Sequence, residues 1–159
     1  MPFLPSYCVT GDKIELMNKK AIIQVKNLVA GYGDDIILDR ISFDVYESEI
    51  FAVLGGSGSG KSTLLKNLLG LHRPASGTIL IDGDDISECD QDDLQQILRK
   101  IGVLYQSAAL FGSMTVAENV ALPIFEYTDL HREYVDHLVK MKLNLVNLDG
   151  YQNHLPSEL

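Results

Sequence analysis

Apolar and polar positions form short runs along the first third of the chain, separated by turn residues. Strand-forming residues occupy Ala21–Val25, and Ile36–Leu38 and Ile41–Val45 follow a turn-rich segment at Ala30–Asp35. Short strands joined by tight turns usually pair in antiparallel fashion. The pattern therefore predicts an antiparallel sheet that forms a separate layer.

The centre of the chain predicts a strand, a turn and a helix in direct succession. Ile50–Leu54 is an unbroken apolar run, which is typical of a strand covered on both faces. Gly55–Gly60 contains only glycine and serine. Lys61–Leu69 has leucines at helical spacing, and Gly70 is a typical residue at a helix end.

Five further elements are predicted after Gly70. The first three are an apolar strand over Thr78–Asp82, a helix over Asp92–Lys100 and a buried strand over Ile101–Tyr105. The fourth is a short helix that begins with a capping box of Thr115 and Glu118 and ends near Pro123. The fifth is a helix capped by Asp129. In the last helix one face carries Tyr134, Val135, Leu138 and Val139.

Asp82 has two interpretations. An apolar run that ends in aspartate is typical of a Mg²⁺-binding strand of the Walker B type. Asp82-Gly83 is also a turn dipeptide, and no glutamate follows it to position water. We therefore favour the turn.

The glycine-rich turn matches the phosphate-binding pattern G-x-x-x-x-G-K-[ST] in the strand–turn–helix context that this pattern requires. Glycines let backbone N–H groups curl into a concave nest, and a helix N-terminus adds unpaired N–H groups and partial positive charge. Lys61 would reach the terminal phosphates, and the Ser62 hydroxyl would bind Mg²⁺. The alternative is a flexible Gly/Ser linker that matches by chance. The candidate binding residues are Gly55, Gly56, Ser57, Gly58, Ser59, Gly60, Lys61, Ser62 and Thr63.

Composition restricts the classes of partner. The chain has 159 residues, and its formal net charge of −9 argues against a nucleic-acid-binding surface. Cys8 and Cys89 show neither a pairing pattern nor metal-ligand spacing, which fits a reducing cytosol. No apolar run approaches the roughly 18 residues of a membrane span. Residues 1–20 are expected to form a loose arm, with Met17 as a natural start.

Five segments together resemble the ATP-binding subunit of ABC transporters. They are Gly31-Tyr32-Gly33, Gly55–Thr63, Ala75–Gly83, Tyr105-Gln106 and the closing LPSEL, so the likeness covers Ala21 to Leu159. The resemblance implies an α/β fold: a RecA-like P-loop NTPase core with an antiparallel β subdomain and part of a helical subdomain. It also explains why Asp82 follows an apolar strand, because in this family the strand at that place ends in a turn.

The resemblance also implies roles for individual residues and implies ATP and Mg²⁺ as cofactors. Tyr32 matches the aromatic residue that stacks on adenine; the alternative is a turn tyrosine with a hydrogen-bonded hydroxyl. Gln106 matches the glutamine that reaches Mg²⁺ and the attacking water, so Lys61 and Gln106 are the candidate catalytic residues and Ser62 and Gln106 the candidate metal ligands.

The chain departs from the family pattern after LPSEL, where the signature motif, the Walker B aspartate, the catalytic glutamate and the switch histidine would follow. We therefore expect an incomplete ABC nucleotide-binding domain over residues 21–159. Alone it should bind nucleotide weakly or not at all and hydrolyse it negligibly. In this family a second ATP-binding subunit completes the site, which implies a homodimer of the intact protein.

The segment Gln106–Pro123 looks like the ATPase of Mla-type systems, which move phospholipids between bacterial membranes. Its apolar residues Leu110, Phe111 and Met114 lie where the family docks a membrane permease; the alternative is burial within the helical subdomain. The implied location is cytoplasmic, on the inner face of the inner membrane. Two other functions remain open: a non-catalytic interaction fragment and a soluble P-loop kinase, for which Arg132 is the one arginine after Gln106.

Overall fold

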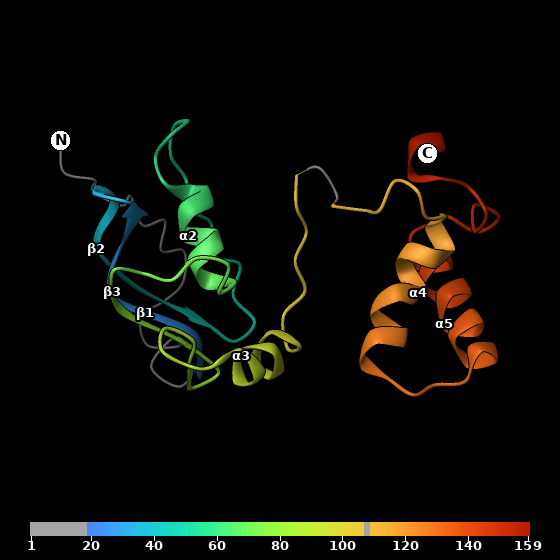
Figure 1. The fold of residues 1–159 in the computed structure, drawn as a ribbon, viewed down its shortest axis with the longest axis horizontal. Coiled ribbons are helices and arrows are strands. Elements are labelled where there is room, and N and C mark those ends of the chain that lie inside the picture. Colours follow the sequence, from blue (N-terminus) through green and yellow to red (C-terminus); the bar gives the residue numbers. More distant parts are fainter. Residues whose placement is uncertain (1–18, 107–108) are drawn as a thin grey trace. The chain divides into compact units, whose positions relative to one another are not determined.

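The computed structural model describes residues 19–106 and 109–159, and the chain divides into two compact units, Met1–Gly102 and Val103–Leu159 (Figure 1). The predicted loose arm lies outside the described residues except for Lys19 and Lys20. Ser107 and Ala108 of the Mla-like segment also lie outside them.

The first unit contains a four-stranded antiparallel sheet, which confirms the antiparallel pairing predicted for its first strands and adds two later strands to that sheet. Its strands lie in the spatial order β2-β1-β3-β4 and are β1 Ala21–Tyr32, β2 Asp35–Tyr46, β3 Ser76–Ile81 and β4 Asp84–Asp85. β1 and β2 are joined by the two-residue turn Gly33-Asp34, in which Gly33 has a φ of 58°. Of the turn predicted over Ala30–Asp35, only Gly33 and Asp34 form a turn.

The two short strands predicted after this turn form one continuous strand, β2. Leu28 pairs with Ile41 and Ala30 pairs with Leu38, so β2 contains one more residue than β1 over this interval. Arg40 has a φ of 48°, and the extra residue is accommodated as a bulge. The polar residues between the two apolar runs mark this bulge and not a strand end.

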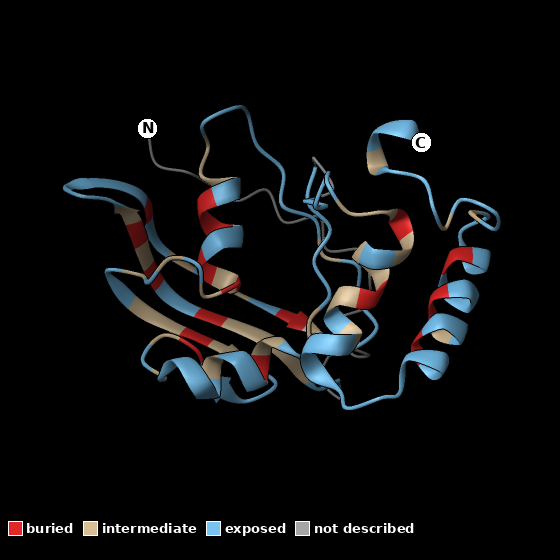
Figure 2. Cartoon of the chain, turned by 45° about the vertical axis from the view of Figure 1, so that its right-hand side comes forward, coloured by how far each residue is buried: buried red, intermediate tan, exposed pale blue. Residues whose placement is uncertain are grey.

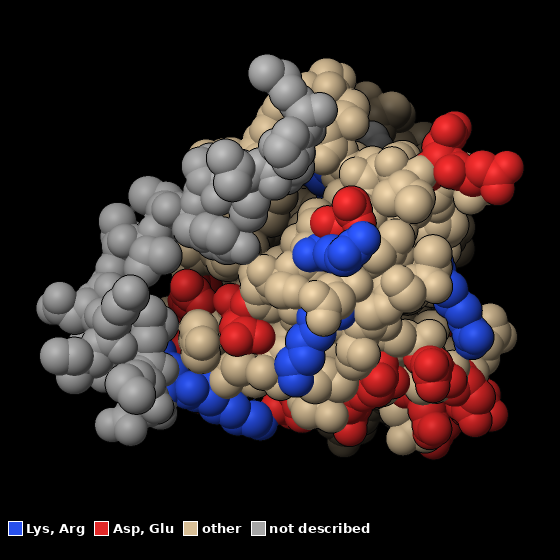
Figure 3. Space-filling view, turned by 90° about the vertical axis from the view of Figure 1, so that its left-hand side faces the viewer, with Lys and Arg blue, Asp and Glu red and all other residues tan. Residues whose placement is uncertain are grey.

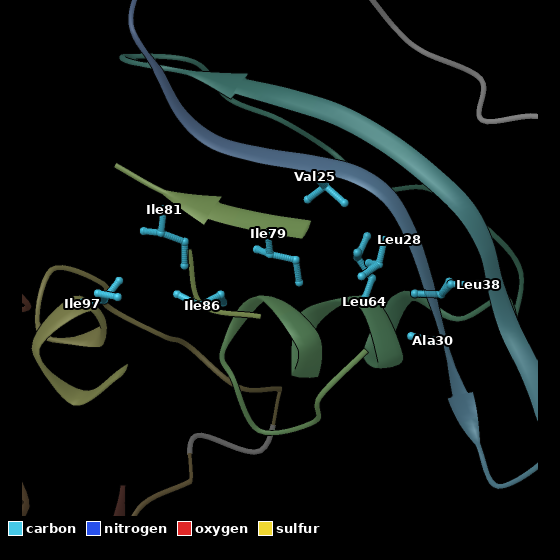
Figure 4. Close-up of a cluster of buried hydrophobic side chains, with 9 residues drawn as sticks. All are labelled: Val25, Leu28, Ala30, Leu38, Leu64, Ile79, Ile81, Ile86 and Ile97. Carbon is cyan, nitrogen blue, oxygen red and sulfur yellow. The ribbon is translucent and has the colours of Figure 1, made fainter. Parts of the chain in front are cut away.

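Helices α2 Lys61–Leu68 and α3 Gln91–Leu98 pack on this sheet through one apolar cluster (Figure 4). Leu64 of α2 points toward Leu28 of β1, and Ile79 and Ile81 of β3 point toward the helices. Both helices lie within two residues of their predicted bounds, because leucine and isoleucine recur on their buried faces. The cluster consists of Val25, Leu28, Ala30, Leu38, Leu64, Ile79, Ile81, Ile86 and Ile97.

Two predicted strands are wrong for this structure. Ile50–Leu54 and Ile101–Tyr105 have no regular secondary structure, and Ile50 and Leu104 are 98% and 89% exposed. A buried parallel strand needs hydrogen-bonded neighbours on both sides. Within residues 19–106 and 109–159, no strand pairs with either segment, so their apolar composition alone does not make them strands.

The second unit is a helical hairpin of α4 Val116–Tyr127 and α5 Arg132–Leu145, followed by the 3₁₀ turn η1 Pro156–Glu158. Buried positions recur once per turn along α5 (Figure 2). They meet the buried positions of α4 in a second core, which consists of Val116, Ala121, Val135, Val139 and Leu143. In the described part of the chain, no helix is both long enough and apolar enough to cross a bilayer.

The predicted end of α4 near Pro123 is wrong, because the helix continues to Tyr127. Pro123 is itself exposed, while Ala121 and Ile124 on either side of it belong to the core shared with α5. A proline inside a helix costs about 3 kcal/mol, which this burial offsets.

The predicted start and buried face of α5 need smaller corrections. The N-cap is His131 and not Asp129. Tyr134 is 63% exposed, whereas Val135 is fully buried, because the buried face follows the spacing of Val135, Val139 and Leu143.

We expect the first turn of α4 to lose stability in acid. The Glu118 carboxylate accepts a hydrogen bond from the backbone N–H of Thr115 at 2.7 Å, and this bond lowers the pKa of Glu118 below its ordinary value of 4.5. The stabilisation is therefore complete above about pH 4.5 and is lost as the pH falls through the lower folded-state pKa. Far-UV circular dichroism should show a smaller acid-induced loss of helix in Glu118→Gln than in the wild type. Glu126→Gln, near the other end of the helix, is the control, and equal losses in all three proteins would contradict the prediction.

Candidate nucleotide-binding site

The glycine-rich loop leads directly into α2, as the sequence predicts. Gly58 and Gly60 have φ values of 78° and 89°, a region that glycine occupies at little cost. The Ser59 N–H donates to the Gly56 carbonyl at 3.3 Å, and the Leu64 N–H donates to the Gly60 carbonyl at 2.8 Å. The loop is therefore a defined turn and not a flexible linker.

Gly60 is the most constrained position of the loop. A Cβ at this position would lie 2.6 Å from Leu38 Cδ2 and 2.9 Å from Ile37 Cγ2, both on β2. Backbone conformation and close packing against the sheet thus both require glycine here.

Lys61 lies over the loop that precedes it. Its ammonium group donates to the carbonyl oxygens of Gly55 at 2.8 Å and Gly56 at 2.7 Å, and it lies 3.4 Å from Ser59 Oγ. A positive charge is therefore held within the curve of the loop, where a phosphate group would need it.

The N-terminus of α2 is open to an anion. Its N-cap is Gly60, which supplies no side-chain hydrogen bond, and its first turn contains no acidic residue. The other three α-helices described each have a side-chain cap or an acidic residue in the first turn. The amides at the start of α2 therefore keep the capacity to bind phosphate.

Ser62 and Thr63 occupy different environments in the first turn of α2. Ser62 is exposed beside the loop, which suits the metal-binding role predicted for its hydroxyl. Thr63 is buried, and its carbonyl accepts a hydrogen bond from the Asn67 side chain at 2.8 Å. Thr63 thus also supports the packing of the helix.

Tyr32 lies at the end of β1, near the second turn of α2. Its hydroxyl accepts a hydrogen bond from the Lys66 ammonium at 3.3 Å, and the bonds from Lys66 and from Thr63 lower the pKa of Tyr32. The residue is 45% exposed. The hydroxyl is therefore bonded, as the alternative interpretation of a turn tyrosine expects, while part of the ring remains accessible to a base.

Gln106 is exposed and belongs to the second unit, whereas the loop belongs to the first. Its predicted roles toward Mg²⁺ and water stay predictions. Leu110 and Phe111 are exposed in the same unit, and Met114 is half-buried. Neither Leu110 nor Phe111 belongs to the second core, which argues against the burial interpretation of this cluster.

Asn119 is a residue that the sequence analysis missed. Its side-chain oxygen accepts from the Phe111 N–H at 2.8 Å, and its side-chain NH₂ lies 3.1 Å from the Phe111 carbonyl oxygen and 3.1 Å from that of Met114. One side chain on α4 therefore binds both backbone groups of Phe111. The signal for it is weak, since an asparagine inside a predicted helix usually indicates only a solvated position.

Asp82 does not contribute to this site. Asp82 and Gly83 have φ values of 52° and 94° and form the turn between β3 and β4, which confirms the favoured interpretation. The Asp82 carboxylate pairs with Lys20 and lies 3.6 Å from the Lys100 ammonium; its pKa is lowered chiefly by Lys20. Acidic side chains gather in groups on the face shown in Figure 3, with lysine and arginine between them.

A profile described as ABC transporter matches residues 38–158. The chain belongs to the ABC transporter family. It is an ATP-binding domain of that family, which confirms the resemblance seen in the sequence.

Two curated relatives belong to transport systems that are named for different substrates. The chain is 42% identical over 137 residues to the probable ribonucleotide transport ATP-binding protein mkl of Mycobacterium leprae, which covers 86% of this chain and 40% of mkl. It is 41% identical over 138 residues to the intermembrane phospholipid transport system ATP-binding protein MlaF of Haemophilus influenzae, which covers 87% of this chain and 52% of MlaF. The chain thus spans only about half, or less, of the length of these relatives.

A solved structure supports the same assignment. The chain is similar to the ATP-binding cassette MJ0796, described as a dimeric post-hydrolysis state bound to ADP and Pi, with a TM-score of 0.76 and 32% identity. The match covers 86% of this chain and 62% of that one. The predicted fold class, a P-loop NTPase cassette of the ABC type, is confirmed.

Gly60→Ala should destabilise the first unit, because the new methyl group meets Leu38 and Ile37 and the backbone has a positive φ. We expect a loss of about 1–3 kcal/mol in the free energy of unfolding, measured by urea titration. Gly56→Ala is the matched control in the same loop, because its Cβ would have nothing within 4 Å, and it should have almost no effect. Equal losses in the two variants would contradict the proposed packing role of Gly60.

Proposed function

We propose that this chain is the ATP-binding portion of an ABC transporter subunit that couples ATP binding and hydrolysis to transport through a membrane permease. One observation carries the proposal: the Lys61 ammonium lies 2.8 and 2.7 Å from the Gly55 and Gly56 carbonyl oxygens, at the start of a helix that has no side-chain cap. The family match and the ADP-bound structural relative support the same function.

ATP with Mg²⁺ fits the residues that form the loop. The loop amides and the start of α2 would bind the phosphates, with Lys61 transferring its hydrogen bonds from the loop carbonyls to the terminal phosphate oxygens. Ser62 would bind Mg²⁺, and Tyr32 would stack on adenine. Bound Mg²⁺ supplies charge neutralisation for phosphoryl transfer. Gln106 is the residue proposed to contact the metal and the attacking water.

Two protein partners are part of the proposal. A second ATP-binding subunit would complete the site, as the dimeric state of the MJ0796 cassette suggests. An integral-membrane permease would contact Leu110, Phe111 and Met114, which would place the protein at the inner face of the inner membrane. The exposure of Leu110 and Phe111 supports a docking role, because both side chains are accessible to a partner.

We further propose that the transported substrate is a phospholipid. The likeness of Gln106–Pro123 to Mla-type ATPases and the 41% identity to MlaF of Haemophilus influenzae support this class. The mkl relative, which is named for ribonucleotide transport, has a similar identity of 42%. Transport assays with lipid and with ribonucleotide in the same reconstituted system therefore decide between the two substrates.

Lys61→Ala should weaken the binding of ATP to the loop. Because a hydrogen bond to a charged group contributes about 1.5–3 kcal/mol, we expect the affinity for Mg²⁺·ATP to fall about 10- to 100-fold. Calorimetric titration of the chain measures this, with Lys142→Ala in α5 as the control. Turnover should be negligible in the wild-type chain alone; measurable turnover that Lys61→Ala abolishes would contradict that expectation.

Phe111→Asp should prevent assembly with the permease without unfolding the second unit, because the Phe111 side chain is 56% exposed. The measurements are recovery of the tagged subunit in detergent-solubilised membrane complexes and the melting temperature of the purified chain. Leu145→Asp, at an exposed leucine on α5, is the control. A large drop in melting temperature for Phe111→Asp would instead indicate a role in the core.

A further inference from the structure

His72, in the loop after α2, contacts the end of β1 at two points. Its Nε2 atom lies 2.7 Å from the carbonyl oxygen of Gly31, the residue before Tyr32. Because a carbonyl oxygen can only accept a hydrogen bond, Nε2 carries a proton and donates it. The backbone before Tyr32 is thus tied to a residue 41 positions later in the chain.

The imidazole ring of His72 also lies against the ring of Tyr32. The ring centroids are 4.9 Å apart and the planes are inclined by 33°, within the range of favourable aromatic contacts. The opposite end of Tyr32 is held by the Lys66 ammonium, 3.3 Å from the hydroxyl oxygen. Tyr32 is therefore held at its backbone, at its ring and at its hydroxyl, and the last two contacts come from α2 and the loop that follows it.

We infer that His72 is a positioning residue for the nucleotide base: it orients the Tyr32 ring so that the exposed part of the ring receives adenine. The inference rests on the proposed nucleotide function and deepens it. A tyrosine that is already ordered loses less side-chain freedom when a base stacks on it, so its affinity for the base is higher. The phosphate-binding residues do not take part in this effect.

A purely structural role makes a different prediction. If His72 only stabilised the first unit, its loss would weaken the binding of every phosphate ligand equally. If it orients Tyr32, its loss weakens only ligands that carry a base. Inorganic tripolyphosphate contains the phosphate chain without the base, so comparing it with ATP separates the two roles.

The test uses calorimetric titration of the full chain with Mg²⁺·ATP and with Mg²⁺·tripolyphosphate. We expect His72→Ala to weaken ATP binding about 2- to 10-fold, the range of one aromatic contact, and to leave tripolyphosphate binding unchanged. In a Tyr32→Ala background, His72→Ala should have no further effect. His72→Gln retains a donor for the Gly31 carbonyl and His72→Phe retains a ring, so the two variants separate the two contacts.

The chain contains a matched control. His154 lies against Tyr151 in the second unit, with ring centroids 5.0 Å apart and an angle of 50° between the planes. His154→Ala removes the same kind of contact within the second unit and should leave the binding of both ligands unchanged.

A ligand-free measurement accompanies the titrations. In the wild type, nuclear Overhauser contacts should join the Tyr32 and His72 rings, with Tyr32→Phe used for assignment. His72→Ala should shift the Tyr32 ring resonances. Unchanged ATP affinity in His72→Ala, or equal weakening of the binding of both ligands, would overturn the inference but not the proposed nucleotide function. Because the chain alone is expected to bind weakly, the titrations use high concentrations of both ligands. Failure of the wild type to bind either ligand under these conditions would overturn the nucleotide function and the inference with it.

Discussion

The close approach between Gly60 and β2 constrains the loop, the helix and the sheet together. The loop enters α2 through a left-handed residue, and that residue lies where a Cβ would collide with Leu38 and Ile37. β2 pairs with β1 as far as Tyr32, and the hydroxyl of Tyr32 is bonded to Lys66 of α2. One absent side chain therefore allows the phosphate loop and the candidate base-binding residue to share a rigid support.

The helices also differ in how their N-terminal amides are satisfied. Asp90 caps α3, and Thr115 with Glu118 caps α4. The first amides of α4 have further acceptors in the carbonyls of His154 and Gln152, at 2.8 and 3.0 Å. α2 has neither arrangement, although a cap typically contributes about 1 kcal/mol. α5 also lacks a side-chain cap, but its first turn contains the acidic Glu133, whereas α2 has neither a cap nor an acidic residue there. The helix that follows the glycine loop is thus the one whose first turn lacks both, which is the expected compromise at a binding site.

Features encoded by neighbouring residues could be predicted from the sequence. The glycine loop, the end of α2 before Gly70, the Asp82-Gly83 turn and the capping box at Thr115 each depend on a few adjacent side chains. The segment Ile50–Leu54 does not form the predicted strand, because strand formation depends on partners elsewhere in the chain. The continuation of α4 past Pro123 likewise depends on burial against α5.

The candidate site shows the same difference between features set by neighbouring residues and features set by distant ones. The phosphate-binding residues are contiguous and were visible as a motif, whereas the contacts of Tyr32 with Lys66 and His72 join residues 34 and 40 positions apart. The role of Asn119 was hidden for a related reason, since its side chain acts on the backbone of a residue eight positions earlier. No pattern of neighbouring residues predicts such a contact.

The two hydrogen bonds between Asn119 and Phe111 have a mechanical consequence. The N–H and the carbonyl of Phe111 are both tied to α4, while its ring projects from the surface. A partner that displaces Phe111 therefore also acts on the first turn of α4, because both backbone groups of Phe111 are bonded to Asn119.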